Sequence, residues 1–151
     1  MSEKRKMWIW LLIPLLYGAL SFALLRIVPP LVGHIVFLAF WVWVGMRFAR
    51  LDGSSLKNFA WGNSLWLVSF LLYLWQFVLV DDANRNIVIA FISQCYVIPF
   101  VVSGAQIYLL FNDNIIDGTN ITIITYIFML VVFMIGFVWG KVKQRSQVKS
   151  I

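Results

Sequence analysis

The longest uncharged run in the sequence sets the main constraint on the fold. Residues 87–111 contain no Asp, Glu, Lys or Arg. As an α-helix, these 25 residues would be about 37 Å long, which exceeds the roughly 30 Å hydrocarbon core of a bilayer. The chain is therefore expected to cross or enter a membrane at this segment.

Composition places the whole chain in the multi-pass membrane class. Hydrophobic residues make up 62% of the 151 residues and charged residues only 12%, whereas about a quarter of a soluble domain is charged. The predicted fold is an all-α integral membrane protein, a single bundle of five transmembrane helices in the cell membrane. The expected spans are about 7–28, 31–49, 59–80, 87–111 and 121–139, followed by a basic tail at 141–151.

The first span is expected to be retained rather than cleaved as a signal peptide. Its apolar run continues to Val28, beyond the small-x-small site at residues 19–21. Within this span, Pro14, Gly18 and Ser21 fall on one helix face. Small residues on a membrane helix let a second helix approach closely, so this face is expected to pack against a neighbour.

Basic residues do not decide the orientation of a five-span bundle. Five crossings would place six Lys and Arg on each side, so the positive-inside rule gives no preference. Two alternatives remain open. If residues 87–111 enter and leave on one side, four spans and one re-entrant segment put both termini together, with ten basic residues on their side and two on the other. If the chain inserts in both directions, the product is an antiparallel dimer.

The run at 87–111 also holds most of the polar residues expected inside the membrane. At 100° per residue, four of its members share one narrow face: Cys95, Pro99, Ser103 and Gln106. Pro99 cannot donate a hydrogen bond to the carbonyl of Cys95, so that oxygen needs another partner. We expect a spanning helix with a proline kink.

A second polar stripe follows the expected span at 59–80. Its members recur at helical spacing: Gly62, Trp66, Ser69, Tyr73 and Gln76. Gln76 and Gln94 are each a few residues from the 81–86 loop, so the two amides are expected to meet in one layer. The pattern is typical of helix packing with interhelical hydrogen bonds, and a ligand-facing wall is the alternative. The candidate contact residues are Ser69, Tyr73, Gln76, Gln94, Cys95, Pro99, Ser103 and Gln106.

The sequence offers little for catalysis or metal binding. It has one His and one Cys, on different spans, and no HExxH, GxSxG or phosphate-loop motif. His34 lies about one turn inside its span, a position typical of an interfacial or packed His. We therefore predict no catalytic residue, no metal site and no cofactor. The basic residues follow the ends of apolar runs, which indicates headgroup contact rather than nucleic acid binding.

Small-residue faces and an apolar exterior are sufficient for a subunit of a larger membrane system. The predicted function is a non-enzymatic accessory, regulatory or protective subunit. The expected partners are the lipid bilayer and another membrane protein or a second copy of the chain. The alternative is a small transporter, channel or hydrophobic-ligand-binding protein, in which polar and aromatic residues of the third and fourth spans line a site.

In span count and in its eight Trp residues, the chain resembles the tryptophan-rich sensory (translocator) family, which binds porphyrins and sterols. The marker of that family is a Trp-Pro-Pro-type loop after the first span. Here Pro29 and Pro30 stand in a turn too short for that loop, with no Trp before them. The resemblance is one of composition, and it implies only that an aromatic ligand pocket belongs with the alternative function.

Overall fold

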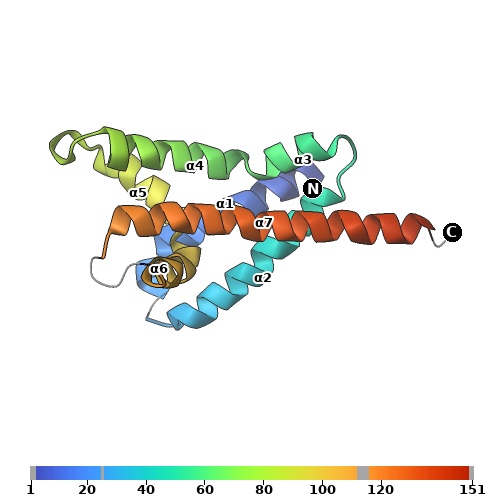
Figure 1. The fold of residues 1–151 in the computed structure, drawn as a ribbon, viewed down its shortest axis with the longest axis horizontal. Coiled ribbons are helices and arrows are strands. Elements are labelled where there is room, and N and C mark those ends of the chain that lie inside the picture. The colour runs from blue at the N-terminus through green and yellow to red at the C-terminus, as the bar shows by residue number, and fades with distance from the viewer. Residues whose placement is uncertain (1–2, 25, 112–115, 150–151) are drawn as a thin grey trace.

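The computed structural model describes residues 3–24, 26–111 and 116–149, and the regular structure of these residues is entirely helical. The α-helices are α1 (Glu3–Leu24), α2 (Pro30–Ala49), α3 (Ser55–Gly62), α4 (Ser64–Leu74), α5 (Ile87–Cys95), α6 (Val101–Leu109) and α7 (Gly118–Lys149). The short helices are the π-helix η1 (Trp75–Leu79) and the 3-10 helices η2 (Asp82–Asn84) and η3 (Ile98–Phe100). The all-α class is therefore confirmed, and Figure 1 shows α7 running along the middle of the molecule.

A proline turn joins α1 to α2. The amides of Ile27 and Val28 donate to the carbonyl of Leu24 (2.9 and 2.8 Å), which closes the end of α1. Pro30 then occupies the first position of α2, where an N–H would have no helical partner. The chain reverses direction here, so α1 and α2 run opposite ways (Figure 1).

The third expected span is broken rather than continuous. The axis of α3 is bent by 49° from that of the α4–η1 helix, and the break is at Asn63. The side chain of Asn63 donates to the carbonyl of Phe59 (2.9 Å), and Ser64 Oγ donates to that of Trp61 (2.8 Å). Polar side chains that bond to nearby carbonyls compete with the helical ladder, which accounts for the break.

The run at 87–111 is broken as well. The side chain of Asn86 caps the start of α5, which ends at Cys95, and η3 with α6 continues at a bend of 49°. The cause is Pro99, which has no N–H to donate to the carbonyl of Cys95. The bend expected at Pro99 is present, but it is a break rather than a kink, since a turn and a stretch of 3-10 helix separate α5 from α6.

Gly18 lets the backbone of α1 approach this break. A Cβ at Gly18 would lie only 1.9 Å from the carbonyl oxygen of Cys95 and 2.8 Å from its Cα. Pro14, Gly18 and Ser21 are all buried, as the predicted small-residue face requires. The carbonyl that Pro99 leaves without a helical donor is thus covered by α1.

The longest helix, α7, begins with a side-chain cap. Asp117 Oδ1 accepts from the amides of Thr119 and Asn120 (2.8 and 3.2 Å), two of the groups that a helix start leaves free. The helix then continues to Lys149, well beyond the expected end of the span at 139. The basic tail is therefore helical as far as it is described, consistent with the high helix propensity of Lys, Arg and Gln.

Among the described helices, α2 and α7 make the most extensive contact, and they cross in the centre of the molecule (Figure 1). A Cβ at Gly136 would lie 2.1 Å from the carbonyl oxygen of Val42, and one at Gly45 would lie 2.4 Å from that of Phe133. Next to this crossing, the fully buried Trp41 donates from Nε1 to the carbonyl of Met129 (3.1 Å). Glycine on both helices therefore brings the two backbones into contact.

By length and composition, two described helices could cross a membrane, α2 and residues Gly118–Gln147 of α7. The number rises to four if each bent pair is one span. One pair is α3 with α4–η1, and the other is α5 with η3–α6. The bundle of five transmembrane helices is therefore not confirmed, whereas a helical protein with two to four membrane-compatible segments is.

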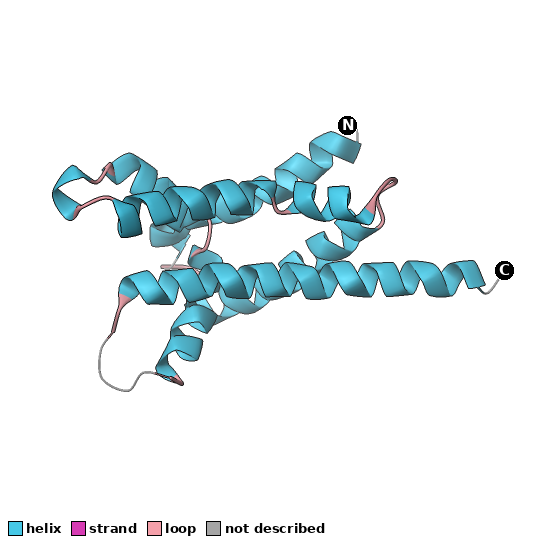
Figure 2. Cartoon of the chain, turned by 45° about the horizontal axis from the view of Figure 1, so that its top comes forward, coloured by secondary structure: helices cyan, strands magenta, loops and turns pink. Residues whose placement is uncertain are grey.

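The start of α1 and the end of α7 lie toward the same end of the molecule (Figures 1 and 2). The loop between α2 and α3 is at this end too, whereas the 80–86 loop and the start of α7 are at the opposite end. Five simple crossings would separate the two termini. The observed arrangement instead places the start of α1 and the end of α7 toward one end of the molecule.

Candidate functional site

A buried histidine joins α2 to the break in the 87–111 segment. His34 Nδ1 lies 2.9 Å from the carbonyl oxygen of Pro99, and His34 Nε2 lies 2.9 Å from Ser103 Oγ. A carbonyl can only accept, so Nδ1 donates to it, and Nε2 forms the second hydrogen bond with the Ser103 hydroxyl. His34 is 6% exposed, which makes it a packed residue that holds η3 and α6 against α2.

A cluster of hydroxyl groups satisfies a second carbonyl freed by the break. Because α5 ends at Cys95, the amide of Val97 donates to the carbonyl of Gln94 (3.1 Å) in a tight turn. The carbonyl of Ser93 instead accepts from Tyr126 OH (2.6 Å) and from Ser69 Oγ (3.1 Å). The two hydroxyls are 2.7 Å apart, so α4, α5 and α7 meet at a single oxygen atom.

Tyr73 and Gln76 stabilise the loops at the end of the molecule opposite the termini. Tyr73 OH donates to the carbonyl of Thr119 at the start of α7 (3.3 Å). Gln76 Oε1 accepts from the amide of Asn86 (2.7 Å), and the Gln76 carbonyl accepts from Arg85 Nε (2.9 Å). Both side chains are almost fully buried, so the predicted stripe on the third span does face inward.

The break separates the four residues expected to share one face of a continuous helix. Cys95 and Pro99 are buried and Ser103 is half-buried, but Gln106 is exposed. The rotation of 100° per residue does not apply across the turn at residues 96–97, so the predicted face is wrong. The expected meeting of Gln76 with Gln94 is also wrong, because the amide of Gln76 is bonded to the backbone of Asn86.

Gln94 lies in a surface groove between α4–η1, α5 and α7, which we name the Gln94 groove. Its outer part has a volume of about 410 Å³, and its inner part has a volume of about 220 Å³. The outer part is lined by Tyr73, Phe77, Asp82, Arg85, Gln94, Gly118, Thr119 and Thr122. The inner part is lined by Gln94, Val97, Ile98, Val101, Thr122 and Thr125. Gln94 and Thr122 line both parts, so the two parts adjoin each other.

Two buried polar atoms have no hydrogen-bond partner among the described residues, Tyr96 OH and Asn63 Oδ1. Each belongs to a residue at a helix break, where the backbone direction is set by other contacts. The ring of Tyr96 packs edge-on against Trp41, with centroids 6.3 Å apart. The aromatic packing therefore places Tyr96 at a position where its hydroxyl gains no bond.

Sequence reasoning missed three of the residues that join the helices: His34, Ser93 and Tyr126. Their partners lie 24 to 69 positions away in the chain, so no local spacing marks them. One signal was available: a proline inside an apolar helix frees carbonyls that buried donors must satisfy. Seeking donors at one end of the fourth span would have pointed to His34.

The arrangement is suited to holding helices together. Most of the interior polar side chains donate to backbone carbonyls of another helix or of their own, and none of the described groups of His, Cys, Asp and Glu could hold a metal ion. Among the described residues, several polar side chains line the outer part of the Gln94 groove, and several also line a pocket of about 520 Å³ formed by Glu3, Leu51, Asp52, Gly53, Lys57, Asn58 and Trp61. In comparisons with known proteins, the chain matches no family model, no curated protein and no solved structure.

Proposed function

We propose that this chain is a multi-pass protein of the cell membrane that serves as a non-enzymatic accessory or regulatory subunit, with both termini on the cytoplasmic side. The observation that carries the proposal is the use of the interior polar groups. The hydroxyls of Ser69 and Tyr126 bond to the carbonyl of Ser93, and the ring of His34 bonds to that of Pro99. Side chains engaged in this way stabilise a bundle, and they do not form a polar path through it.

The outer surface supports a membrane location. Large apolar side chains face outward on several helices, including Leu16 (59% exposed), Ile35 (57%), Leu71 (56%) and Ile135 (53%). A soluble monomer rarely exposes so much contiguous apolar surface, whereas lipid tails or a partner helix would cover it.

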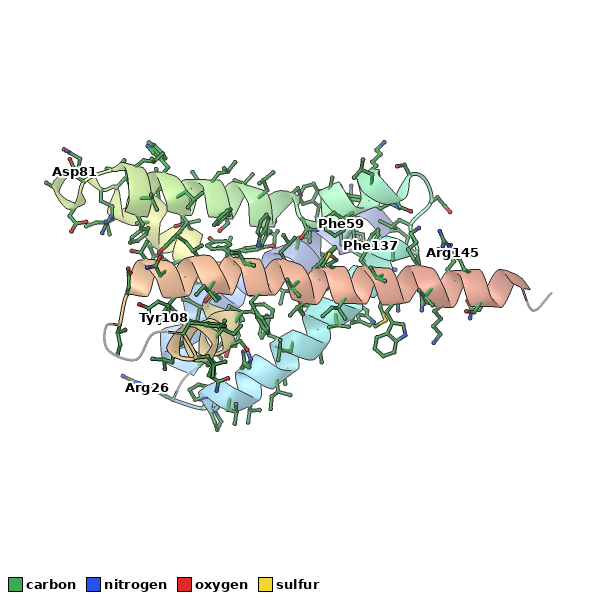
Figure 3. The ribbon with its side chains drawn as sticks, viewed as in Figure 1. Arg26, Phe59, Asp81, Tyr108, Phe137 and Arg145 are labelled. Carbon is green, nitrogen blue, oxygen red and sulfur yellow. The ribbon has the colours of Figure 1, made fainter. Side chains whose placement is uncertain are left out.

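Charge supports the orientation. Ten basic residues belong to the segments at the end that holds both termini: Lys4, Arg5, Lys6, Arg47, Arg50, Lys57, Lys141, Lys143, Arg145 and Lys149. The opposite end carries Arg26 and Arg85 together with Asp81, Asp82 and Asp117. Figure 3 shows Arg145 at one end and Arg26 with Asp81 at the other. Positive residues are retained on the cytoplasmic side, so the termini belong there.

Labelling of the two termini tests this topology. Single cysteines at Ser2 and Ser150, each in a Cys95→Ala chain, should both react with a membrane-impermeant maleimide only after the cytoplasmic face is opened. Labelling of intact cells reports exposure on the outer face, and labelling of inverted vesicles reports exposure on the cytoplasmic face. Labelling on opposite sides would restore five crossings, and equal labelling from both sides would establish dual insertion.

Purification under gentle conditions tests the subunit role. The tagged full chain, expressed at a low level and extracted in a mild detergent, is expected to retain another membrane protein in a fixed stoichiometric ratio. An unrelated tagged multi-pass protein at the same level is the control for carry-over. Recovery of the chain alone or as a homo-oligomer would contradict the proposal and favour the alternative function of a small transporter, channel or hydrophobic-ligand-binding protein.

A further inference from the structure

The mouth of the Gln94 groove carries one positive and one negative side chain. Arg85 and Asp82 form an ion pair, with the arginine side chain 25% exposed and the aspartate 90% exposed. The guanidinium is fixed in place, because its Nε donates to the carbonyl of Gln76 and it lies 4.3 Å above the ring of Phe77. A ligand entering here therefore meets a rigid cation beside a freely accessible anion.

Aromatic side chains form one wall of the outer groove. Tyr73 and Phe77 are stacked, with centroids 4.6 Å apart and an angle of 20° between the rings. Phe77 belongs to the π-helical turn η1, and π-turns occur frequently at functional sites. The hydrogen bond from Tyr73 to the carbonyl of Thr119 holds this wall against α7, so the groove is preformed.

The inner part of the groove is apolar. Val97, Ile98 and Val101 form one side of it. On the other side, the hydroxyls of Thr122 and Thr125 donate to carbonyls of their own helix, at 2.8 and 2.7 Å. These two hydroxyls are already bonded, so the inner part fits a hydrocarbon chain.

Gln94 stands where the polar and apolar parts meet. No described residue forms a hydrogen bond with its side-chain amide, although that side chain is only partly exposed. The amide nitrogen of Gln94 is therefore available to donate to a ligand that places an acceptor at this depth.

We propose that the Gln94 groove binds a zwitterionic glycerophospholipid. The phosphate pairs with Arg85, the ammonium group lies near Asp82, and an ester carbonyl accepts from the amide of Gln94. One acyl chain then follows Val97, Ile98 and Val101. Arginine is well suited to phosphate, and the order of groups along the groove, charged, then polar, then apolar, is that of a phospholipid. This inference does not depend on the subunit role.

Native mass spectrometry of the purified full chain tests the proposal. The protein in mild detergent is titrated with dioleoylphosphatidylcholine, and the wild type is expected to retain one lipid molecule. Val101→Trp fills the apolar part of the groove and should weaken retention about tenfold, which corresponds to about 1.4 kcal/mol. Val131→Trp is the matched control, since Val131 lies on α7 outside the groove and is 38% exposed against 40% for Val101.

A second pair of variants keeps the test decisive if Val101→Trp does not fold. Gln94→Leu should weaken lipid retention, whereas Gln106→Leu, the same change at an exposed amide outside the groove, should not. Free phosphocholine should not displace the lipid, because it lacks the acyl chain. The proposal is overturned if phosphocholine competes as well as a second phospholipid does, which would assign the groove to a soluble zwitterion. Wild-type retention in the folded groove variants would also overturn it.

Discussion

Gly18→Ala is expected to lower the free energy of unfolding by about 1–3 kcal/mol, the usual range for forcing extra atoms into a packed interior. The new Cβ would lie 1.9 Å from the carbonyl oxygen of Cys95. The neighbour is backbone, which cannot move aside as the end of a flexible side chain can. Either α1 must withdraw from the break, or the turn after α5 must shift. Thermal unfolding of the purified protein in detergent measures the effect.

Gly118→Ala is the matched control for this change. Gly118 is also a helical glycine, but a Cβ there would meet nothing within 4 Å. Because alanine has the higher helix propensity, Gly118→Ala should leave stability unchanged or raise it slightly. If the two variants unfold at the same temperature, the close approach of α1 to Cys95 does not exist in the folded protein.

Tyr126→Phe should lower the free energy of unfolding by about 1–2 kcal/mol, as expected for interhelical hydrogen bonds in membrane proteins. The change removes the bond to the carbonyl of Ser93 and the contact with Ser69 Oγ, and it leaves Ser69 as the remaining donor to that carbonyl. The aromatic ring is retained, so packing against Trp66 and Phe70 is preserved. Unfolding in a titration with a denaturing detergent gives the measurement.

Tyr96→Phe makes the same chemical change with the opposite expected sign. Tyr96 is as deeply buried, but its hydroxyl has no partner among the described residues. Removing a buried hydroxyl that makes no hydrogen bond relieves its desolvation cost, so stability should rise by about 1 kcal/mol. A loss equal to that of Tyr126→Phe would show that the Tyr96 hydroxyl is bonded in the membrane-embedded protein.

The helical class and the inward faces were predictable, because they depend on local spacing. Pro14, Gly18 and Ser21 recur at intervals that place them together on any α-helix, and they are buried together. The stripe from Ser69 to Gln76 was predictable for the same reason. Each of these inferences used residues within one continuous helix.

The break at Asn63 was not predicted, and at Pro99 a kinked spanning helix was preferred to a re-entrant segment. The wrong grouping of residues on one face of 87–111 follows from the second break. The grouping of Cys95 with Gln106 assumed one regular helix across the turn at residues 96–97. At Asn63, the sequence does contain the side chains that compete for carbonyls, yet the long apolar pattern around them favours a continuous span. Whether such side chains bond to nearby carbonyls depends on which residues of other helices pack against them. The local sequence does not contain that information.

His34 is a second case in which the local sequence predicted the burial of a residue but not its contacts. Its depth in the span indicated a packed or interfacial residue, and it is indeed packed. Its role as a joint between α2 and the Pro99–Ser103 segment depends on the carbonyl of Pro99 and the hydroxyl of Ser103, which follow the break in the 87–111 segment. The function of the ring therefore follows from a residue 65 positions away.

The separation of charge between the two ends also has an electrical consequence. Ten basic residues belong to one end together with only Glu3 and Asp52, whereas Asp81, Asp82 and Asp117 outnumber the two arginines at the other end, so the bundle has a permanent dipole along its length. A membrane potential contributes about 2.3 kcal/mol per 100 mV for each elementary charge moved across the bilayer. In the orientation proposed above, with the cell interior negative, the field favours the basic end inside, and collapse of the potential removes that contribution.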